Sequence, residues 1–402
     1  MKILVLKFGG TSVANIDRIR NVASIVQKKC SKYKVVVVLS AMAGVTDNLQ
    51  KLIDEIGYED SPETDLVLTS GEQVSIALLS MLLNKKNIKS TPLLGWQVPI
   101  ITDNCHGKAR ILNIDEKVIK NKLKTNDVIL IAGFQGISTE GNIISLGRGG
   151  SDTTAVAIAS AINAERCDIF TDVEGVYSVD PNIDPNAKKI DKISYEEMLE
   201  TASLGAKVLQ TRSVELAMKN NLNLQVLSSI VNSKGTLIIN ENSLVEKETV
   251  SGISYSKNES KVSISGVPDK PGISAKIFGI LAQNNINVDM IVQNISQDGI
   301  NANLTFTVES RDMSVAKKLL ETNNLGIDFK SITSDDDVAK ISVIGLGMKS
   351  QSGVAQKMFQ TLADNKINIL AISTSEIKIS VIIEETSTVK AVKKLHNIFN
   401  LD

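Results

Sequence analysis

The sequence predicts an α/β protein, in which a large domain with a mainly parallel β-sheet precedes two small ferredoxin-like (βαββαβ) modules. Three observations lead to this prediction. Short β-branched runs alternate with longer helical patterns over residues 1–240. The strand segments are continuously apolar, as expected when helices cover both faces of a sheet. Finally, a stretch of 17 residues recurs near the carboxyl end of the chain.

The elements of the large domain follow one another in a strand-helix order. Two apolar strand segments at 2–8 (KILVLKF) and 34–40 (KVVVVLS) flank an amphipathic helical pattern at 15–30. Later, the strand segment 127–134 (DVILIAGF) precedes the helical pattern 151–162 (SDTTAVAIASAI). This alternation is typical of parallel strands joined by crossover helices. The polar stretch 241–250 (ENSLVEKETV) is interpreted as a linker, so we place a domain boundary at 245.

The carboxyl-terminal part contains two copies of one module. Residues 272–288 align without gaps on 353–369, with eight of the seventeen positions identical. Each copy has the pattern of a strand, a glycine-containing loop, a helix and two further strands. In the first copy, Ile277, Ile280 and Leu281 fall on one helix face and should pack on a small sheet.

The composition excludes several classes of protein. A chain of 402 residues should hold two or three domains. Its 44 basic and 45 acidic residues give no net field that would recruit nucleic acid or a membrane surface. We find no stretch of ~20 apolar residues, and the apolar run 3–6 is too short for a secretion signal. Three cysteines, far apart and odd in number, argue against disulfides and zinc and favour a reducing cytoplasm.

Three glycine-bearing segments follow predicted strands, and they are KFGGTS (7–12), VVLSAMAGVTD (37–47) and IAGFQG (131–136). Loops at the carboxyl ends of parallel strands converge on one crevice. Glycines there let backbone N–H groups approach a phosphate, and Lys7 adds a mobile cation. The GxxxxGK[ST] spacing is absent, so the first segment is no P-loop. Taken alone, it is explained equally well by a plain strand-to-helix turn.

Two further segments carry charge beside predicted helix starts. In LGRGGSDTTA (146–155), Ser151 or Asp152 makes a good N-cap, but a cap leaves Arg148 unexplained. A guanidinium among glycines suits a small carboxylate ligand. Glu72 in TSGEQVS is either a carboxylate that stabilises the helix dipole or a functional group.

The remaining polar residues give weaker indications. FTDVEGVYSVDP (170–181) could hold a base and a ribose, or form a hairpin. His106 and His396 are the only histidines in the sequence, and no serine-histidine-aspartate set indicates a hydrolase. For His106, a contact with a substrate is the less favoured interpretation, and for His396 no such contact is expected.

Taken in order, seven motifs resemble those of the aspartokinases in the amino acid kinase family. They are KFGGTSV, SAMAGVTD, SGEQVS, AGFQG, LGRGGSDTTAVAIA, FTDVEGVYSVDP and ASLGAKVLQTRSVELA. The tail resembles the paired ACT domains of that family. The resemblance implies a three-layer amino-acid-kinase domain at 1–245 and a regulatory region at 246–402. Its first ACT domain would span about 261–335, and its second about 340–402 plus a strand from about 249–258.

The resemblance implies transfer of the γ-phosphoryl group of ATP to the β-carboxylate of L-aspartate, which gives 4-phospho-L-aspartate. This reaction opens the synthesis of lysine, threonine and methionine. The acceptor is already ionised at neutral pH, so no general base is needed. Cations and N–H dipoles must then offset the repulsion between acceptor and triphosphate. By the same resemblance, Mg²⁺ would be bound through the nucleotide phosphates, with no metal ligands assigned in the protein.

The family pattern also assigns site residues. The catalytic group would be Lys7, Asp152, Arg148 and Glu72. Aspartate would be held by Thr46, Glu72, Arg148, Gly149, Gly150 and Ser151. The nucleotide would be held by Lys7, Phe8, Gly9, Gly10, Ser40, Thr171, Asp172, Tyr177, Asn182, Lys207 and Val208. Many relatives have arginine where this sequence has Asn182, which weakens that one assignment.

For regulation, the resemblance implies an end-product amino acid, lysine and/or threonine, bound at the ACT domains. The residues concerned would be Asp269, Gly272, Ile273, Ser274, Ala275, Asp289, Gln293, Asn294, Val354, Ala355, Ser375 and Glu376. Alternatively, these are only turns and strand ends of a dimerising module. Exposed strand edges favour pairing between chains, so we expect at least a homodimer.

Other functions remain open at this point. A related kinase could act on glutamate, N-acetylglutamate or a nucleoside monophosphate. A regulatory sensor with a silent kinase domain would show substitutions at Lys7, Glu72, Arg148 or Asp152, and all four are present. We expect a monofunctional enzyme, because the length leaves no room for a fused dehydrogenase.

Overall fold

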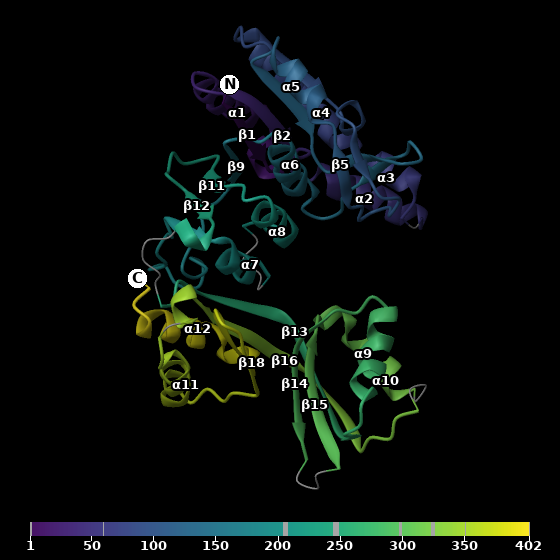
Figure 1. Ribbon diagram of the computed structural model, residues 1–402, viewed down its shortest axis with the longest axis vertical. Coiled ribbons are helices and arrows are strands. Elements are labelled where there is room, and N and C mark those ends of the chain that lie inside the picture. Colours follow the sequence, from purple (N-terminus) through teal and green to yellow (C-terminus); the bar gives the residue numbers. More distant parts are fainter. Residues whose placement is uncertain are drawn as a thin grey trace. The chain divides into compact units, whose positions relative to one another are not determined.

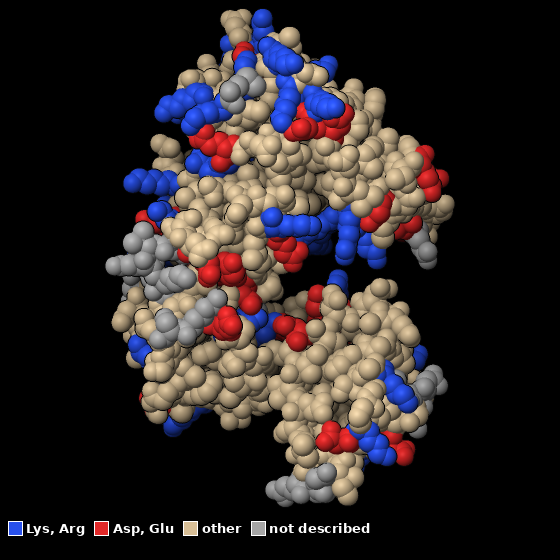
Figure 2. Space-filling model, viewed as in Figure 1, with Lys and Arg blue, Asp and Glu red and all other residues tan. Residues whose placement is uncertain are grey.

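The computed structural model describes residues 2–58, 60–203, 208–243, 249–296, 300–322, 326–349 and 351–401. It separates into two compact units (Figure 1). Unit 1 comprises Met1–Val176, Lys189–Ala202 and Lys207–Val245, and unit 2 comprises Tyr177–Lys188, Ser203–Ala206 and Glu246–Asp402. Basic and acidic side chains both occur on each unit (Figure 2), as expected for a net charge of −1.

Unit 1 is built on an eight-stranded sheet of order β10-β12-β11-β9-β1-β2-β6-β3. Every neighbouring pair is parallel except β11 and β12. The strands are β1 (Ile3–Phe8), β2 (Lys34–Leu39), β3 (Ser90–Leu93), β6 (Val128–Ala132), β9 (Arg166–Thr171), β10 (Lys192–Ser194), β11 (Leu224–Ser228) and β12 (Thr236–Ile239). A smaller sheet of order β5-β4-β7-β8 contains β4 (Ile100–Thr102), β5 (Ile111–Ile114), β7 (Gln135–Ser138) and β8 (Ile143–Ser145).

Helices cover both faces of the large sheet, so its strands are buried on both sides. Alternate β1 residues face separate cores, with Val5 in one and Leu6 in the other. The Leu6 core includes side chains of α1 (Ile16–Cys30) and α4 (Ser70–Lys85). The Val5 core includes side chains of α5 (Glu116–Leu123), α6 (Gly150–Ala161), α7 (Tyr195–Ser203) and α8 (Thr211–Lys219). This three-layer arrangement confirms the fold class that the continuous apolar runs predict.

Local sequence signals explain where these helices begin. The side chain of Asn15 accepts a hydrogen bond from the N–H of Arg18 and caps α1.

Two further helices, α2 (Val45–Ile56) and α3 (Pro62–Leu68), precede α4. The segment Pro62–Lys85 has the length and hydropathy of a membrane span, although the sequence shows no uninterrupted run of ~20 apolar residues. Half of its apolar window is buried inside the protein, as in a core helix.

Unit 2 contains a six-stranded sheet of order β14-β15-β13-β16-β18-β17, and both ferredoxin-like halves share it. Its strands are β13 (Gly252–Pro268), β14 (Val288–Ile295), β15 (Asn301–Val308), β16 (Ser331–Ile344), β17 (Ala371–Thr374) and β18 (Lys378–Glu384). Its helices are α9 (Ile273–Gln283), α10 (Met313–Glu321), α11 (Val354–Asp364) and α12 (Thr388–Ile398).

The two long strands join the halves of unit 2. The first part of β13, residues 252–256, pairs with residues 340–344 of β16, which in turn pair with β18. The second part of β13 pairs with the start of β16 and with β15. Each half therefore receives one strand from a chain segment that begins in the other half.

The internal repeat is visible as two equivalent helices. Both α9 and α11 begin after a glycine in the left-handed region, with φ of 91° at Gly272 and 97° at Gly353. In α9, Ile277 and Leu281 are buried against the sheet and Ile280 is half-buried, as the periodicity predicts. Residues 244–248 of the expected linker at 241–250 lie outside the described residues.

Candidate active site

The carboxyl ends of four neighbouring strands, β9, β1, β2 and β6, lie at one edge of the large sheet. Backbone hydrogen bonds connect the loops that follow them. The N–H of Gly9 donates to Phe170, that of Ser40 to Phe8, and that of Gly133 to Leu39, at 3.3, 3.1 and 2.9 Å. The three glycine-bearing segments therefore converge, as expected for parallel strands.

Lys7 and Asp152 form an ion pair at this edge. Nζ of Lys7, at the end of β1, lies 2.5 Å from Oδ1 of Asp152 in the first turn of α6. Both side chains are largely buried, at 12% and 9% exposed. A β-carbon on Gly9 would lie 3.4 Å from Nζ of Lys7, and one on Gly10 would lie 3.0 Å from the Ala41 carbonyl oxygen. The two glycines thus leave a narrow backbone turn beside a fixed cation, which is suited to an anion.

One carboxylate oxygen of Glu72 has no hydrogen-bond partner among the residues that the structure describes. Its side chain lies in the first turn of α4 and is only 3% exposed. Oε1 accepts a hydrogen bond of 3.0 Å from the N–H of Ala41, whereas Oε2 is buried and unpartnered among the described residues. Burial raises the pKa of Glu72 from 4.5 to about 7. A ligand with a hydrogen-bond donor would supply the partner that this buried oxygen lacks among the described residues.

The loop before α6 carries the exposed cation Arg148, and the N-cap of this helix differs from the predicted one. Gly147 and Gly149 have φ of 74° and 73°, and Arg148 between them is exposed. Gly149 is the N-cap residue, without any side-chain cap bond. Ser151 is instead a buried residue of the first turn, and its Oγ lies 2.7 Å from where a Gly133 β-carbon would be. Its hydroxyl therefore packs at the end of β6, and the expected Ser151 or Asp152 cap is wrong.

The remaining predicted residues are less concentrated. Ser40 and Thr46 are half-buried, and Thr171 at the end of β9 donates a 2.9 Å hydrogen bond to the carboxylate of Asp172. The ring of Phe8 stacks on Phe170 with centroids 4.5 Å apart.

The other four predicted nucleotide residues are not placed at this edge by the contacts described above. Tyr177 and Asn182 belong to unit 2. Val208 is half-buried in a turn, and Lys207 lies outside the described residues.

Asp65 and His106 are in contact in the structure, although none of the sequence motifs predicts that they pair. Asp65 of α3 contacts His106, in the loop that precedes β5. The only sequence signal was an aspartate five residues before the SGEQVS motif. No group of three or more His, Cys, Asp or Glu residues with metal-binding geometry occurs within the described part of the chain.

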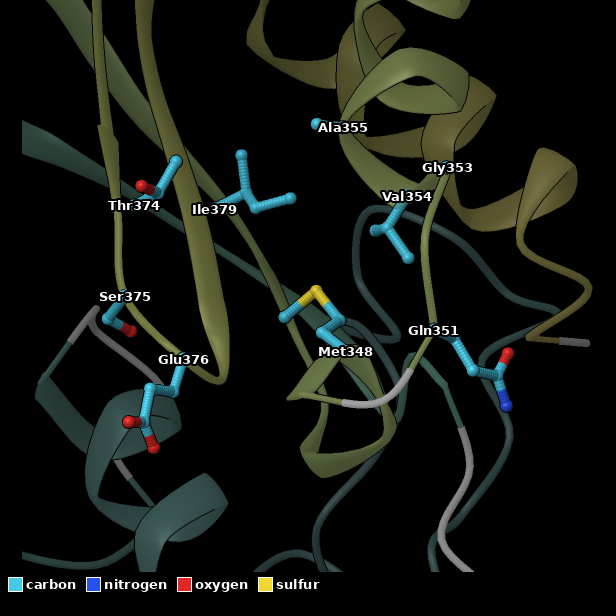
Figure 3. Close-up of a pocket in the computed structure, with 9 residues that line it drawn as sticks. All are labelled: Met348, Gln351, Gly353, Val354, Ala355, Thr374, Ser375, Glu376 and Ile379. Atoms are coloured by element: carbon cyan, nitrogen blue, oxygen red, sulfur yellow. The ribbon is translucent and has the colours of Figure 1, made fainter.

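A pocket of about 490 Å³ lies in unit 2 at the start of α11. Four predicted effector residues line it: Val354, Ala355, Ser375 and Glu376. The other residues that line it are Met348, Gln351, Gly353, Thr374 and Ile379. Thr374, Ser375 and Glu376 lie on one side and Gly353 and Val354 on the other, with Met348 between them (Figure 3).

The effector residues predicted in the first repeat are mostly exposed. Gly272 caps α9, whose first turn includes Ile273, Ser274 and Ala275, and Ser274 donates a 3.2 Å hydrogen bond to Gln293 of β14. Asn294 follows on β14. The N–H of Asp269 donates to the Ile300 carbonyl at 3.0 Å. Asp289 forms an ion pair with Lys340, a buried lysine that also pairs with Glu259 at 2.7 Å.

Comparison with known proteins gives matches over the whole chain. Residues 2–228 match the model of the amino acid kinase family, and residues 262–323 and 341–399 match an ACT domain model. An aspartate kinase of Pseudomonas fluorescens is 48% identical over 407 residues, which cover 100% of this chain and 98% of that protein.

Two solved structures of Escherichia coli aspartokinase III are also similar. The complex with aspartate and ADP (R-state) has a TM-score of 0.83 at 25% identity, with 99% of both chains covered. The complex with lysine and aspartate (T-state) has a TM-score of 0.77 at 26% identity, with 100% of both chains covered.

Proposed function

The chain belongs to the amino acid kinase family as an aspartate kinase with ACT domains, and from this premise we propose how its residues phosphorylate aspartate. The observation that carries the proposal is a buried oxygen of Glu72 to which no residue in the described part of the chain donates, at the edge where Lys7 and Asp152 are paired. The acceptor would be the β-carboxylate of L-aspartate, and the product 4-phospho-L-aspartate.

Two groups would recognise the amino-acid end of the substrate. Oε2 of Glu72 would accept a hydrogen bond from the α-ammonium, because none of the described residues donates to this oxygen. Arg148 would bind the α-carboxylate with its forked guanidinium, because it is exposed on a loop that two glycines shape. Gly149, Gly150, Ser151 and Thr46 would line the same subsite.

Charge is the main obstacle to the transfer. Two unit charges ~4 Å apart repel each other by about 4 kcal/mol at an effective dielectric constant near 20, and the nucleotide carries several charges. Lys7 would offset this repulsion at the transferring phosphoryl group, with the N–H groups of Gly9 and Gly10 beside it. Asp152 holds the ammonium of Lys7 in place, since their atoms are 2.5 Å apart in a largely buried setting.

We propose that the nucleotide is ATP and that its divalent metal ion is Mg²⁺. The two-glycine turn and the cation of Lys7 fit a phosphate chain. Bound Mg²⁺ would neutralise part of the phosphate charge through the phosphate oxygens. Ser40, Thr171 and Asp172 would contact the nucleotide, and Tyr177, Asn182, Lys207 and Val208 are further candidates from the motif pattern.

We propose that the effector is an end-product amino acid of the lysine and threonine pathways, bound at the ACT domains. The pocket at the start of α11 supports this assignment, because it combines Glu376 and Ser375 with an apolar floor at Met348 and Ile379. Lysine is bound in one of the similar E. coli structures. Titration calorimetry with lysine, threonine, methionine and diaminopimelate would identify the effector here.

We further propose a homodimer that works in the cytoplasm. Ile291 and Ile295 on the edge strand β14 are 49% and 64% exposed, which supports pairing of this edge with a second chain. The three cysteines are free thiols, which suits a reducing compartment. The domain boundary would lie at 245, between the catalytic and regulatory regions.

Kinetics of Arg148→Ala would test the proposed subsite. We expect the KM for aspartate to rise at least ~10-fold, because a charge-assisted hydrogen bond is worth about 1.5–3 kcal/mol, while the KM for ATP stays nearly constant. An equal loss of both would refute the role of Arg148. A coupled assay with aspartate, glutamate and N-acetylglutamate tests the acceptor, and activity with glutamate alone would refute the choice of aspartate.

A further inference from the structure

Asp65 clamps the loop before β5 to helix α3. Its carboxylate is fully buried, and its two oxygens bind the same loop. Oδ2 lies 2.7 Å from Nδ1 of His106, and Oδ1 accepts a 3.3 Å hydrogen bond from the N–H of Gly107. The side chain of His106 is 22% exposed. A buried carboxylate with both oxygens occupied fixes the position of its partners, because losing either bond would leave a buried oxygen unsatisfied.

Hydrogen bonds connect the Asp65–His106 pair, which we call the clamp, to helix α4, which carries Glu72. The hydroxyl of Thr69 donates a 2.8 Å hydrogen bond to the Asp65 carbonyl and joins α3 to the start of α4. The carbonyl of Thr69 also accepts a 3.0 Å bond from Gln135 of β7. Glu72 follows in the first turn of α4, so its position depends on the anchoring of α3.

On the other side, the clamp is continuous with the loop that carries Arg148. The N–H of Ala109 donates a 3.1 Å hydrogen bond to Ser145 at the end of β8. The guanidinium of Arg212 bridges both loops, with bonds of 2.8 Å to the Ala109 carbonyl and 3.2 Å to the Leu146 carbonyl. A β-carbon on Gly147 would lie 2.7 Å from the carbonyl oxygen of Gly107. The Arg148 loop therefore rests directly on the residue that Asp65 holds.

We propose that Asp65 and His106 are positioning residues, which set the separation between Glu72 and Arg148 and thereby the binding of aspartate. This inference rests on the proposed function, in which those two residues bind the ammonium and the α-carboxylate. Recognition at two points needs a fixed spacing, and a displacement of about 1 Å can cost on the order of 10²-fold in rate. Neither Asp65 nor His106 need touch the substrate.

The test compares His106→Val with His106→Asn. Valine removes the donor to Asp65, whereas the amide nitrogen of asparagine takes nearly the place of Nδ1 and can restore the bond. We expect His106→Val to raise the KM for aspartate by about 10-fold or more, and His106→Asn to stay within about 3-fold of the parent. The KM for ATP should change little in both. Equal increases in the two KM values, or no rescue by asparagine, would overturn the proposal.

Two further measurements separate positioning from general stability. In the double variant His106→Val with Arg148→Ala, the aspartate effects should be less than additive, because the clamp acts through Arg148. Full additivity contradicts the proposal. If His106→Val fails to fold, His106→Gln replaces it, since its amide lies near Nε2 and misses Asp65; an unchanged aspartate KM there is an equally negative result.

These variants also distinguish the two levels of inference. An unchanged aspartate KM in Arg148→Ala would refute the proposed substrate site itself. A raised KM in Arg148→Ala without any rise in His106→Val would refute the clamp alone.

Discussion

Replacing Glu72 with glutamine should stabilise the free enzyme and weaken aspartate binding at the same time. The carboxylate is buried, one oxygen accepts the Ala41 N–H, and the other has no partner among the described residues. Glutamine keeps the acceptor for Ala41 and removes the charge. We therefore expect a more stable enzyme that has lost its ligand for the α-ammonium, which is the usual trade between function and stability.

The magnitude follows from the pKa of Glu72. Burial raises this pKa from 4.5 to about 7. One pKa unit is worth about 1.4 kcal/mol, so the ionised group costs roughly 3 kcal/mol in the folded enzyme. Between these two pKa values the folded state holds a proton that the unfolded state has lost. Stability therefore falls by about 1.4 kcal/mol per pH unit as the pH rises through this window, and it levels off above the folded pKa.

The assay compares chemical unfolding of the parent and Glu72→Gln from about pH 5 to about pH 8.5, with the first unfolding transition followed in both. The difference in unfolding free energy should grow with pH in favour of the variant, by up to about 3 kcal/mol. In parallel, calorimetry should show that parent affinity for aspartate weakens below about pH 7, where Glu72 becomes protonated. The variant should bind aspartate weakly at every pH.

Parallel stability curves for the two proteins would refute the reasoning, because they would mean that Glu72 ionises in the folded enzyme without cost. Retained aspartate affinity in the variant would refute the assigned contact even if the stability difference appeared. Glu63→Gln serves as a control, since Glu63 is exposed and its pKa is lowered by hydrogen bonds of its own backbone N–H and of Ser61.

Two other substitutions test the local structure. Gly149→Ala should destabilise the enzyme by more than ~1 kcal/mol, because φ is 73° and the new β-carbon would lie 1.9 Å from Cγ of Gln210. Gly141→Ala is its matched control, with φ of 88° and open space around it, so thermal unfolding should place it between the parent and Gly149→Ala. Lys7→Met should abolish activity and cost about 3–5 kcal/mol, since it leaves Asp152 buried without its cation. The double variant Lys7→Met with Asp152→Leu should recover stability but not activity, and recovered activity would exclude the role of Lys7.

Much of the fold follows from short-range patterns. The apolar runs of β1, β2 and β6 identify buried parallel strands, because only a sheet covered on both faces tolerates such continuity. The repeat at 272–288 and 353–369 identifies two equivalent helices, each introduced by a left-handed glycine. Strand order and the exchange of strands between the halves of unit 2 involve pairing over long sequence separations, for which periodicity carries no signal.

The site was partly predictable for the same reason. Loops at the carboxyl ends of parallel strands must converge, so Lys7, Ser40 and Gly133 could be grouped from sequence. The prediction that Ser151 caps α6 is wrong because the left-handed Gly149 is already the N-cap residue. The side chain of Ser151 packs closely against Gly133 instead.

The sequence by itself determined the fold class, the repeat and the set of charged residues at the catalytic edge, because these depend on residue type and local spacing. Only the tertiary structure decided which polar and charged side chains pair with one another. Lys7 pairs with Asp152, Asp65 binds His106, and one oxygen of Glu72 has no partner among the described residues. The physical reason is that burial and pairing depend on atoms brought together from distant parts of the chain. Burial and pairing together set the free-energy cost of keeping each side chain ionised.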